Sequence, residues 1–293
     1  MNAPLSVITP SFRSSRWLKL CIPSVADQGV KLEHIVQDSE SDDGTRDWLP
    51  HDQHVTAIFE KDKGMYDAVN RGLRRTSGEI CSYLNCDEQY LPGALAAVQD
   101  YFATHPKIEV LFADAVVVDS NGGYICHRPA ILPTRYHSMV TNNLAILTCA
   151  TFFRRRVFAE RGLFFDTKWR DLGDAHWILS LLSQKVPMAV LRRFTTSFTD
   201  TGENMNLRPN AIREKAETFN MAPFWVRKLK HLVALKYRVR KMSAGLYSQA
   251  PFDYSIYTAE SPAQRVNFTV DKPTARWLRP PPPAAAHPAS AIP

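Results

Sequence analysis

Strand-like runs alternate with helical patterns through about the first 90 residues, and this alternation restricts the fold more than any other feature of the sequence. Helical patterns separate the runs, and in residues 65–73 the apolar side chains recur at the spacing of one helix face. Such alternation predicts an α/β fold with a mostly parallel sheet and right-handed crossovers. The four runs, each rich in β-branched and other apolar residues, are 5–9, 32–36, 55–59 and 80–84.

Polar residues follow each of the four predicted strands. The carboxyl ends of parallel strands share one edge of a sheet, and ligands bind beyond that edge, so we expect these residues to converge on one site. They are Thr9, Pro10 and Ser11 after the first strand, Asp38 after the second, Glu60 to Lys63 after the third, and Asn85, Asp87 and Glu88 after the fourth. The adjacent carboxylates of the last group suit a hard cation such as Mg²⁺ that shares its shell with phosphates. A solvated turn is the alternative interpretation of this acidic pair.

The second half of the chain has a less regular pattern. Residues 93–102 indicate a helix, and 110–118 indicate a strand that continues through a hairpin turn into a second strand. Asp174 stands in the first turn of another predicted helix, and residues 186–196 predict a further strand. Residues 129–148 show no pattern that predicts an element.

Composition and cysteine usage exclude several classes of protein. The chain has 293 residues, of which 45% are apolar, so it can form a substantial core. Its five cysteines are an odd number without a C-x-x-C pair, which indicates a reducing compartment and no zinc site. No apolar run approaches the length of a membrane span, and the N-terminus lacks the pattern of a signal peptide. We therefore expect a cytoplasmic protein.

The positive charge of the chain is concentrated in residues 224–242. This segment holds seven Lys and Arg and no acid, and the net charge of the chain is +7. An imperfect apolar face accompanies the charges, so we predict a basic amphipathic helix over 223–243. It could lie on the inner face of the cytoplasmic membrane or pack on the rest of the protein with a solvated basic face. Nucleic-acid binding is not indicated, because no reader motif accompanies this one helix.

The motifs resemble those of the inverting glycosyltransferases of family 2, which have the GT-A fold. The resemblance covers roughly residues 4–205. Residues 62–72 are its most specific part and resemble the D-K-G-x-Y-D-A-x-N-x-G run of the polysaccharide-synthesis branch, near the colanic-acid type enzymes. The four matching stretches are 7–12, 36–45, 62–72 and 84–88.

The resemblance implies a role for each matching residue. Thr9, Pro10 and Phe12 match the loop against the nucleotide, and Asp38 matches the acid that recognises the base, usually uracil. Asp87 and Glu88 match the D-x-D-type pair that handles the ribose, the diphosphate and a Mg²⁺ or Mn²⁺ ion. Asp174 matches the general base that acts on the acceptor hydroxyl. The expected donor-binding residues are Thr9, Pro10, Ser11, Phe12, Asp38, Glu60, Lys63, Gly64, Asp67, Asn85 and Asp87.

The expected protein is thus a GT-A enzyme that transfers a sugar from a nucleotide-sugar donor to a glycan or lipid-linked acceptor. A UDP-sugar is the favoured donor. A catalytic domain is expected over 1–222, the basic helix over 223–243 and a C-terminal extension over 244–279. A disordered Pro/Ala-rich tail is expected over 280–293. The alternative is a non-catalytic protein of the same fold that binds nucleotide sugars or a membrane surface. The sequence does not indicate an oligomeric state.

The chain departs from the family pattern at several positions. Glu88 stands where Asp is usual, and Ser39 and Glu40 replace residues that are often glycine. The C-terminal Q-x-x-R-W motif and the membrane spans of processive synthases are missing, which favours a single-transfer enzyme. Two local alternatives stay open: Asp171 competes with Asp174 as the base, and Asp67 could cap its helix or pair with a neighbouring arginine.

Overall fold

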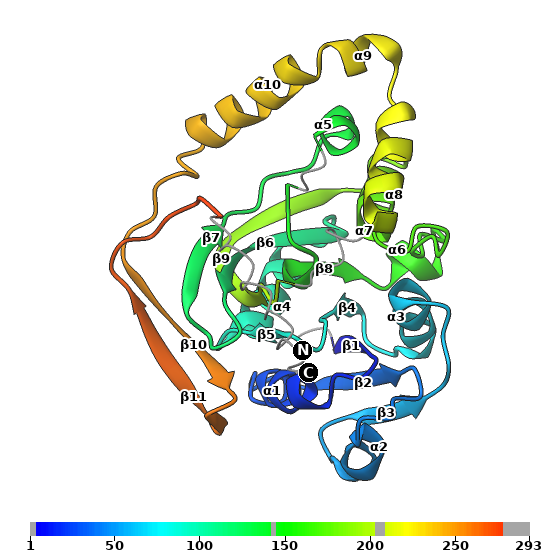
Figure 1. Cartoon of the computed structure of the whole chain (residues 1–293), viewed down its shortest axis with the longest axis vertical. Coiled ribbons are helices and arrows are strands. Elements are labelled where there is room, and N and C mark those ends of the chain that lie inside the picture. The colour runs from blue at the N-terminus through cyan, green and yellow to red at the C-terminus, as the bar shows by residue number, and fades with distance from the viewer. Residues whose placement is uncertain (1–3, 142–144, 203–208, 278–293) are drawn as a thin grey trace, which may run out of the picture.

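A mixed sheet of nine strands forms the centre of the molecule in the computed structural model, which describes residues 4–141, 145–202 and 209–277 (Figure 1). The strands are β1 (Leu5–Ser11), β2 (Leu32–Asp38), β3 (Thr56–Phe59), β4 (Ile80–Tyr83), β5 (Glu88–Tyr90), β6 (Val110–Val118), β7 (Tyr124–Arg128), β8 (Thr151–Arg154) and β9 (Met188–Thr199). They lie in the order β3-β2-β1-β4-β8-β6-β9-β5, and β7 pairs with β6.

Helices cover both faces of this sheet. They are α1 (Ser15–Ala26), α2 (Thr45–Trp48), α3 (Met65–Arg75), α4 (Ala94–Thr104), α5 (Arg135–Val140), α6 (Arg156–Ala159), α7 (Gly173–Ser183), α8 (Pro209–Asn220), α9 (Phe224–Lys228) and α10 (Lys230–Ser243). Two single turns of 3₁₀ helix, Leu49–His51 and Thr148–Ala150, and a hairpin of β10 (Phe252–Thr258) and β11 (Ser261–Val270) complete the described elements.

Strand direction confirms the expected α/β class. The strands β1 to β4 are parallel, and β6 and β9 are parallel to each other. Because β8 is antiparallel to both β4 and β6, all six of these strands point the same way, while β5, β7 and β8 run against them. The reversed strands all belong to the second half of the sheet, where the sequence pattern is less regular.

The two faces of the sheet follow the period-two alternation of its strands. Ile8 and Phe112 face one core with α3 and α7, whereas their neighbours Val7 and Leu111 face a second core with α1 and α4. A Cβ atom at Gly72 of α3 would lie 2.4 Å from the Cγ2 atom of Ile8, so this glycine lets α3 lie directly on β1. That close approach fixes the position of the α3 N-terminus at the sheet edge.

Several predicted boundaries are wrong. The first strand continues through Pro10 to Ser11. Proline has no N–H to donate, but the Pro10 nitrogen faces the side of β1 on which β4 has already ended, so no hydrogen bond of the sheet is lost. Glu88, expected in a loop, begins β5 and pairs with β9. The helices α5 and α8 were missed, and the single helix expected over 223–243 is broken near Leu229 into α9 and α10.

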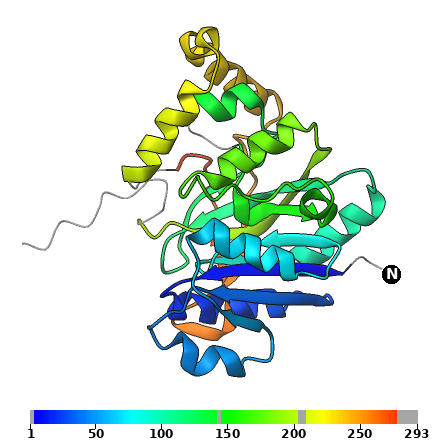
Figure 2. The same cartoon turned by 90° about the vertical axis from the view of Figure 1, so that its right-hand side faces the viewer.

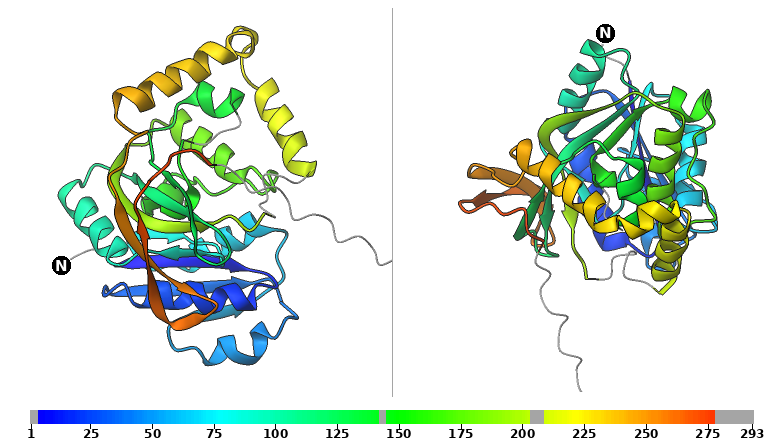
Figure 3. Two further views of the ribbon diagram at one scale, coloured as in Figure 1. Left: turned by 60° about the vertical axis from the view of Figure 1, so that its left-hand side comes forward. Right: turned by 90° about the horizontal axis from the view of Figure 1, so that it is seen from above.

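The segment after α10 returns to the sheet. Its hairpin β10–β11 packs on α1 and β5 (Figure 3). At β5 the Gln89 side chain exchanges two 2.8 Å hydrogen bonds with the backbone of Tyr257. The helices α8, α9 and α10 form an arch at the end of the molecule opposite α2 (Figures 1 and 2). The proposed domain limits stay a prediction, and the tail over 280–293 lies outside the described residues. No described helix combines the length and apolar character that crossing a bilayer requires.

Candidate functional site

The loops that follow the parallel strands touch one another at one edge of the sheet. Ser39 N donates to Ser11 O over 2.8 Å, and Cys86 Sγ lies 3.1 Å from Pro10 O, which joins the ends of β1, β2 and β4. From the other half of the sheet, Thr199 Oγ1 at the end of β9 donates to Asp87 O over 2.5 Å. The structure therefore brings the strand-end residues of both halves together around residues 84–88.

The turn between β4 and β5 presents the acidic pair. Glu88 Oε2 accepts a 2.8 Å hydrogen bond from Asn85 N, and Asn85 O accepts one of 3.1 Å from Glu88 N. This reciprocal pair closes the turn and leaves Asp87 at its tip, half-buried, with no side-chain hydrogen bond to another residue in the described ranges. Glu88, by contrast, is buried beneath the turn. The two carboxylates thus occupy different positions although they are adjacent in the sequence.

The oxygen atoms around this turn fit a hard cation. Burial raises the pKa of the Asp87 carboxyl. Burial and the neighbouring Asp87 charge raise the pKa of Glu88. A cation bound beside the two groups would stabilise both in their ionised forms. Glu88 Oε1 and Asn85 Oδ1 are buried without a hydrogen-bond partner among the described residues. No group of three acidic, His or Cys ligands occurs in the described part of the chain. A cation would therefore take further oxygens from its ligand and from water, as Mg²⁺ commonly does.

The residues expected against the nucleotide divide into two groups. The Thr9 hydroxyl lies 2.9 Å from the His34 ring inside the core, and both Ser11 Oγ and Ser41 Oγ donate to Asp38 Oδ2 over 2.8 Å. Asp38 is fully buried in these contacts, which hold the turn after β2. Phe12 is different, because 56% of its side chain is exposed at the end of β1. Of this set, Phe12 presents an exposed aromatic ring, and the Arg13 guanidinium lies 5.1 Å from its centroid.

The loop before α3 is held by local interactions. Gly64 has a φ of 132°, in the region that favours glycine, and its N–H donates to Asp62 Oδ1 over 2.8 Å. Asp67 accepts a 3.0 Å hydrogen bond from Lys63 N and pairs with Arg71 at 3.0 Å. These local contacts were one of the two expectations for Asp67, and its contact with a donor stays a prediction. The Lys63 side chain is exposed.

Glu60, at the end of β3, also interacts with arginines of α3. Its carboxylate pairs with Arg75 at 3.0 Å and with Arg71 at 3.3 Å. Glu60 therefore anchors α3 to β3, and a contact between Glu60 and a ligand would have to compete with these ion pairs.

Asp174 lies against Tyr66, which brings the first turns of α7 and α3 together. Burial raises the pKa of Asp174 to about 6, while hydrogen bonds from Ala175 N and the Tyr66 side chain oppose the rise. Burial raises the pKa of the Tyr83 hydroxyl on β4, and the charges of Asp174 and Glu88 raise it further, so both carboxylates lie near Tyr83. The arrangement places a carboxyl with a raised pKa near the acidic turn, as general bases require.

Two features of the Asp174 environment were missed from the sequence. A Cβ atom at Gly173 would lie 2.5 Å from the Tyr66 ring, so the absence of a side chain there permits the Tyr66–Asp174 contact. Glu214, on α8, accepts hydrogen bonds from the backbone N–H groups of Arg170, Asp171 and Leu172 at 2.9, 3.0 and 2.9 Å. The Asp171 carboxylate itself accepts a 2.7 Å bond from Asn210 Nδ2. Nothing in the spacing of the sequence indicates that Glu214, 42 to 44 positions further along the chain, would hold this loop.

Comparisons with known proteins agree on the family. The family model described as glycosyl transferase family 2 matches residues 6–162, more than half of the chain. A PGL/p-HBAD biosynthesis glycosyltransferase of Mycobacterium tuberculosis is 26% identical over 204 residues, which cover 66% of this chain and 74% of that protein. An uncharacterized glycosyltransferase of the same species is 25% identical over 240 residues, 78% of this chain and 90% of that protein.

Solved structures show the same fold. Residues 1–349 of S. aureus TarS, in complex with UDP-GlcNAc, match with a TM-score of 0.56 at 17% identity, over 75% of this chain and 68% of that one. The mannosyltransferase PcManGT of Pyrobaculum calidifontis, in complex with GDP-Man and Mn²⁺, matches with a TM-score of 0.52 at 19% identity, over 74% of this chain and 61% of that one. The fold expected from the motifs, GT-A, is confirmed by these matches.

Proposed function

The chain belongs to glycosyl transferase family 2, and on that premise we propose that it is a metal-dependent, inverting hexosyltransferase that takes its sugar from a nucleotide-diphosphate sugar. A UDP-sugar is the favoured donor, and a glycan or lipid-linked acceptor of cell-surface polysaccharide synthesis is the favoured acceptor. The observation that carries the proposal is a pair of carboxyls whose pKa burial raises, Asp87 at the tip of the turn after β4 and Asp174 in the first turn of α7, with Tyr83 near both Asp174 and Glu88. The donor complexes of TarS and PcManGT support it.

Each residue has a distinct task in the proposed reaction. Asp87, with oxygens of Asn85 and Glu88 beside it, would hold Mg²⁺ or Mn²⁺, which when bound supplies charge neutralisation to the departing diphosphate. Phe12 stacks on the base, and exposed Lys63 reaches the phosphates. Asp174 accepts the proton of the acceptor hydroxyl as that oxygen attacks the anomeric carbon, while Tyr66 holds the carboxylate in place.

A donor panel tests this function. The protein is incubated with UDP-sugars and with GDP-mannose in Mn²⁺ or Mg²⁺, with and without an extract that contains acceptors, and nucleotide release is measured. We expect one donor to release its nucleotide several times faster in the presence of the extract. Tight nucleotide binding without any acceptor-dependent release would instead assign the chain to the non-catalytic, sugar-nucleotide-binding alternative.

The helices α9 and α10 extend the proposal to a membrane surface. Leu232, Leu235, Val239 and Met242 lie at the spacing of one helix face and are between 47% and 66% exposed, and Trp225 on α9 is exposed as well. Val233, which was expected on the same face, instead packs against a buried cluster beneath the helix. An exposed apolar face among basic residues and without an acid suits the headgroup region of an anionic bilayer. We therefore propose that α10 holds the enzyme on such a surface, which suits a lipid-linked acceptor.

Flotation with liposomes measures this contact. We expect binding that requires anionic lipid, weakens in high salt, and falls strongly in the double variant Leu232→Gln, Leu235→Gln. Ile212→Gln is the control, because Ile212 is at least as exposed as the two leucines but lies on α8. Equal binding to neutral vesicles, or full binding by the double variant, would contradict the proposed surface.

A further inference from the structure

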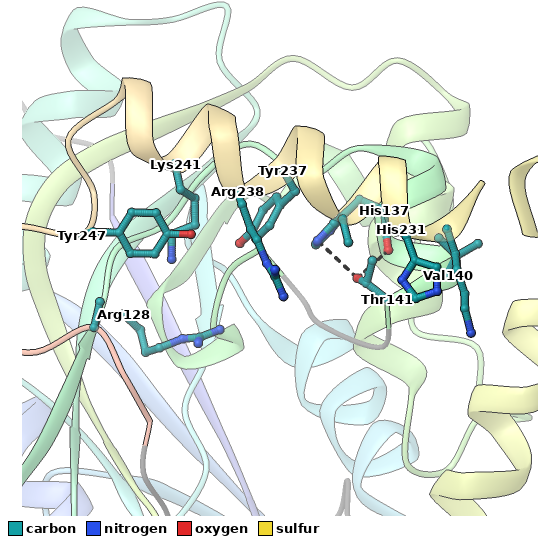
Figure 4. A pocket seen from close by; sticks show the side chains of 12 residues that line it. Arg128, His137, Val140, Thr141, His231, Tyr237, Arg238, Lys241 and Tyr247 are labelled. Atoms are coloured by element: carbon teal, nitrogen blue, oxygen red, sulfur yellow. Dashed lines mark hydrogen bonds between the residues drawn. The ribbon is translucent and has the colours of Figure 1, made fainter.

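The inward face of α10 lines a cavity that the proposed donor site does not use. Figure 4 shows this pocket between α10, α5 and the end of β7. Its volume is about 450 Å³, within the range of small-ligand sites. The helix α5 packs against both α10 and α7, and α7 carries Asp174 in its first turn. The pocket is therefore joined to the candidate base through a single intervening helix.

Cations and histidines dominate the lining of this pocket. No Asp or Glu lines it among the described residues, and its other polar groups are hydroxyls such as Thr141 Oγ1, which lies 3.2 Å from His137 Nε2 (Figure 4). The basic side chains come from three separate elements, which distinguishes this pocket from the solvated face of one helix. They are Arg128, His137, Lys230, His231, Arg238 and Lys241.

Lys241 is the most informative of these residues. It is 7% exposed, and no hydrogen bond or ion pair reaches its ammonium group from the residues that the structure describes. Its nearest aromatic contact is the Tyr247 ring, 5.1 Å from Nζ. Burial, together with the positive charges of Arg128 and Arg192, lowers its pKa to about 8. A buried cation next to other cations is unfavourable without an anion.

The charge of Asp114 acts on Lys241 but compensates it only in part. Asp114 already pairs with Arg192 at 2.9 Å and accepts a 2.7 Å hydrogen bond from Ala130 N. His137 adds no charge at neutral pH, because burial lowers its pKa to about 4, and its buried Nδ1 has no partner among the described residues. The pocket therefore combines the Lys241 ammonium, which has no hydrogen-bond or ion-pair partner among the described residues, with other basic groups, hydroxyls and an opening to solvent.

We propose that the pocket between α5 and α10 binds a phosphate or diphosphate group, with Lys241, Arg238 and Arg128 as its ligands. The source of the phosphate rests on the proposed function: a lipid of the membrane surface on which α10 lies carries the group. Leu235 and Val239 face outward on α10 while Arg238 and Lys241 face the pocket, so one helix would contact both the bilayer and a phosphate drawn from its surface. The pocket would thereby hold the phosphorylated end of the acceptor lipid.

Calorimetry with inorganic pyrophosphate in EDTA tests the pocket separately from the donor site, because no cation is then present for Asp87. We expect wild-type protein and Asp87→Asn to bind equally, and Lys241→Met to bind at least about tenfold more weakly, as the loss of one charge-assisted hydrogen bond predicts. Lys236→Met is the matched control: it removes the same charge from the exposed side of α10 and should change affinity less than about twofold. Arg238→Gln, at an exposed position, is a second test if Lys241→Met fails to fold.

Vesicles then distinguish the source of the phosphate. Wild-type protein should prefer phosphatidylcholine vesicles that contain phosphatidic acid over vesicles of equal surface charge that contain phosphatidylserine, and Lys241→Met should lose that preference but still bind both. Pyrophosphate binding without any such preference would overturn the lipid source and leave a soluble phosphate-bearing ligand. Absence of pyrophosphate binding, or equal binding by wild type and Lys241→Met, would overturn the site itself, whatever the donor panel shows.

Discussion

The Asp174→Asn variant is expected to bind the nucleotide donor like wild type and to lose transfer by a factor of about 10² to 10⁴, the usual contribution of a general base. The side chain keeps its size and its hydrogen bond to Ala175 N, so the turn should be preserved. Only the ability to accept a proton is removed. Single-turnover and steady-state rates with the donor found in the panel measure the loss, and calorimetry with the nucleotide checks that binding is retained.

Asp171→Asn is the matched control for this prediction. Asp171 lies three residues earlier, and its carboxylate accepts a hydrogen bond from Asn210 Nδ2 that an amide oxygen can still accept. We expect a small change in rate for this variant. If Asp174→Asn keeps more than about a tenth of the wild-type rate while Asp171→Asn loses most of it, then Asp171 is the base.

The pH profile gives an independent check of the same residue. A base acts only after losing its proton, and burial raises the pKa of Asp174 to about 6, so turnover should fall about tenfold per pH unit below 6 and level off above it. Stability should respond in the opposite sense. Since the folded-state pKa lies above the ordinary value, the ionised carboxyl disfavours folding as pH rises from about 4 to 6, and Asp174→Asn should unfold at the same or a higher temperature at pH 7.

The first half of the fold follows closely from the sequence. Local periodicity determines each element, and β1, β2 and β3 pair in chain order across one crossover each, while β4 crosses back to pair with β1. The second half depends on contacts over long separations. Glu88 enters β5 because the chain crosses to β9, where it pairs with Phe198, and no local pattern indicates that partner. The helix α5 is fixed in a similar way, by packing against α7 and α10, and α8 packs against α5.

The candidate site shows the same division. The polar ends of the strands could be predicted to meet, because parallel topology alone requires it. Their individual tasks could not, because hydrogen bonds decide them: Ser11 and Ser41 enclose Asp38, and Arg71 and Arg75 engage Glu60. The same residue types in a parallel sheet could point either inward or toward a ligand.

The second large effect is expected at Asp87. Asp87→Asn should leave the turn intact, because the turn is closed by Asn85 and Glu88, and should remove the charged ligand at its tip. We expect cation-dependent affinity for UDP to fall by more than about 100-fold, since even residues that only orient a metal ligand contribute about 10- to 100-fold. Glu88→Gln shows whether the second carboxylate also contacts the cation: the Gln oxygen can still accept from Asn85 N, so any loss of affinity reports on the unpartnered Oε1.

Calorimetric titration of UDP in the presence of Mn²⁺ and again in EDTA is the most direct test of a cation-assisted donor site at this turn. The wild-type protein and Asp47→Asn, which removes an exposed carboxylate from α2, should bind UDP far more tightly with Mn²⁺ than with EDTA. Asp87→Asn should bind with the same weak affinity in both. If Asp87→Asn keeps the Mn²⁺-dependent gain of the wild type, Asp87 does not hold the cation, and the donor site proposed here is wrong.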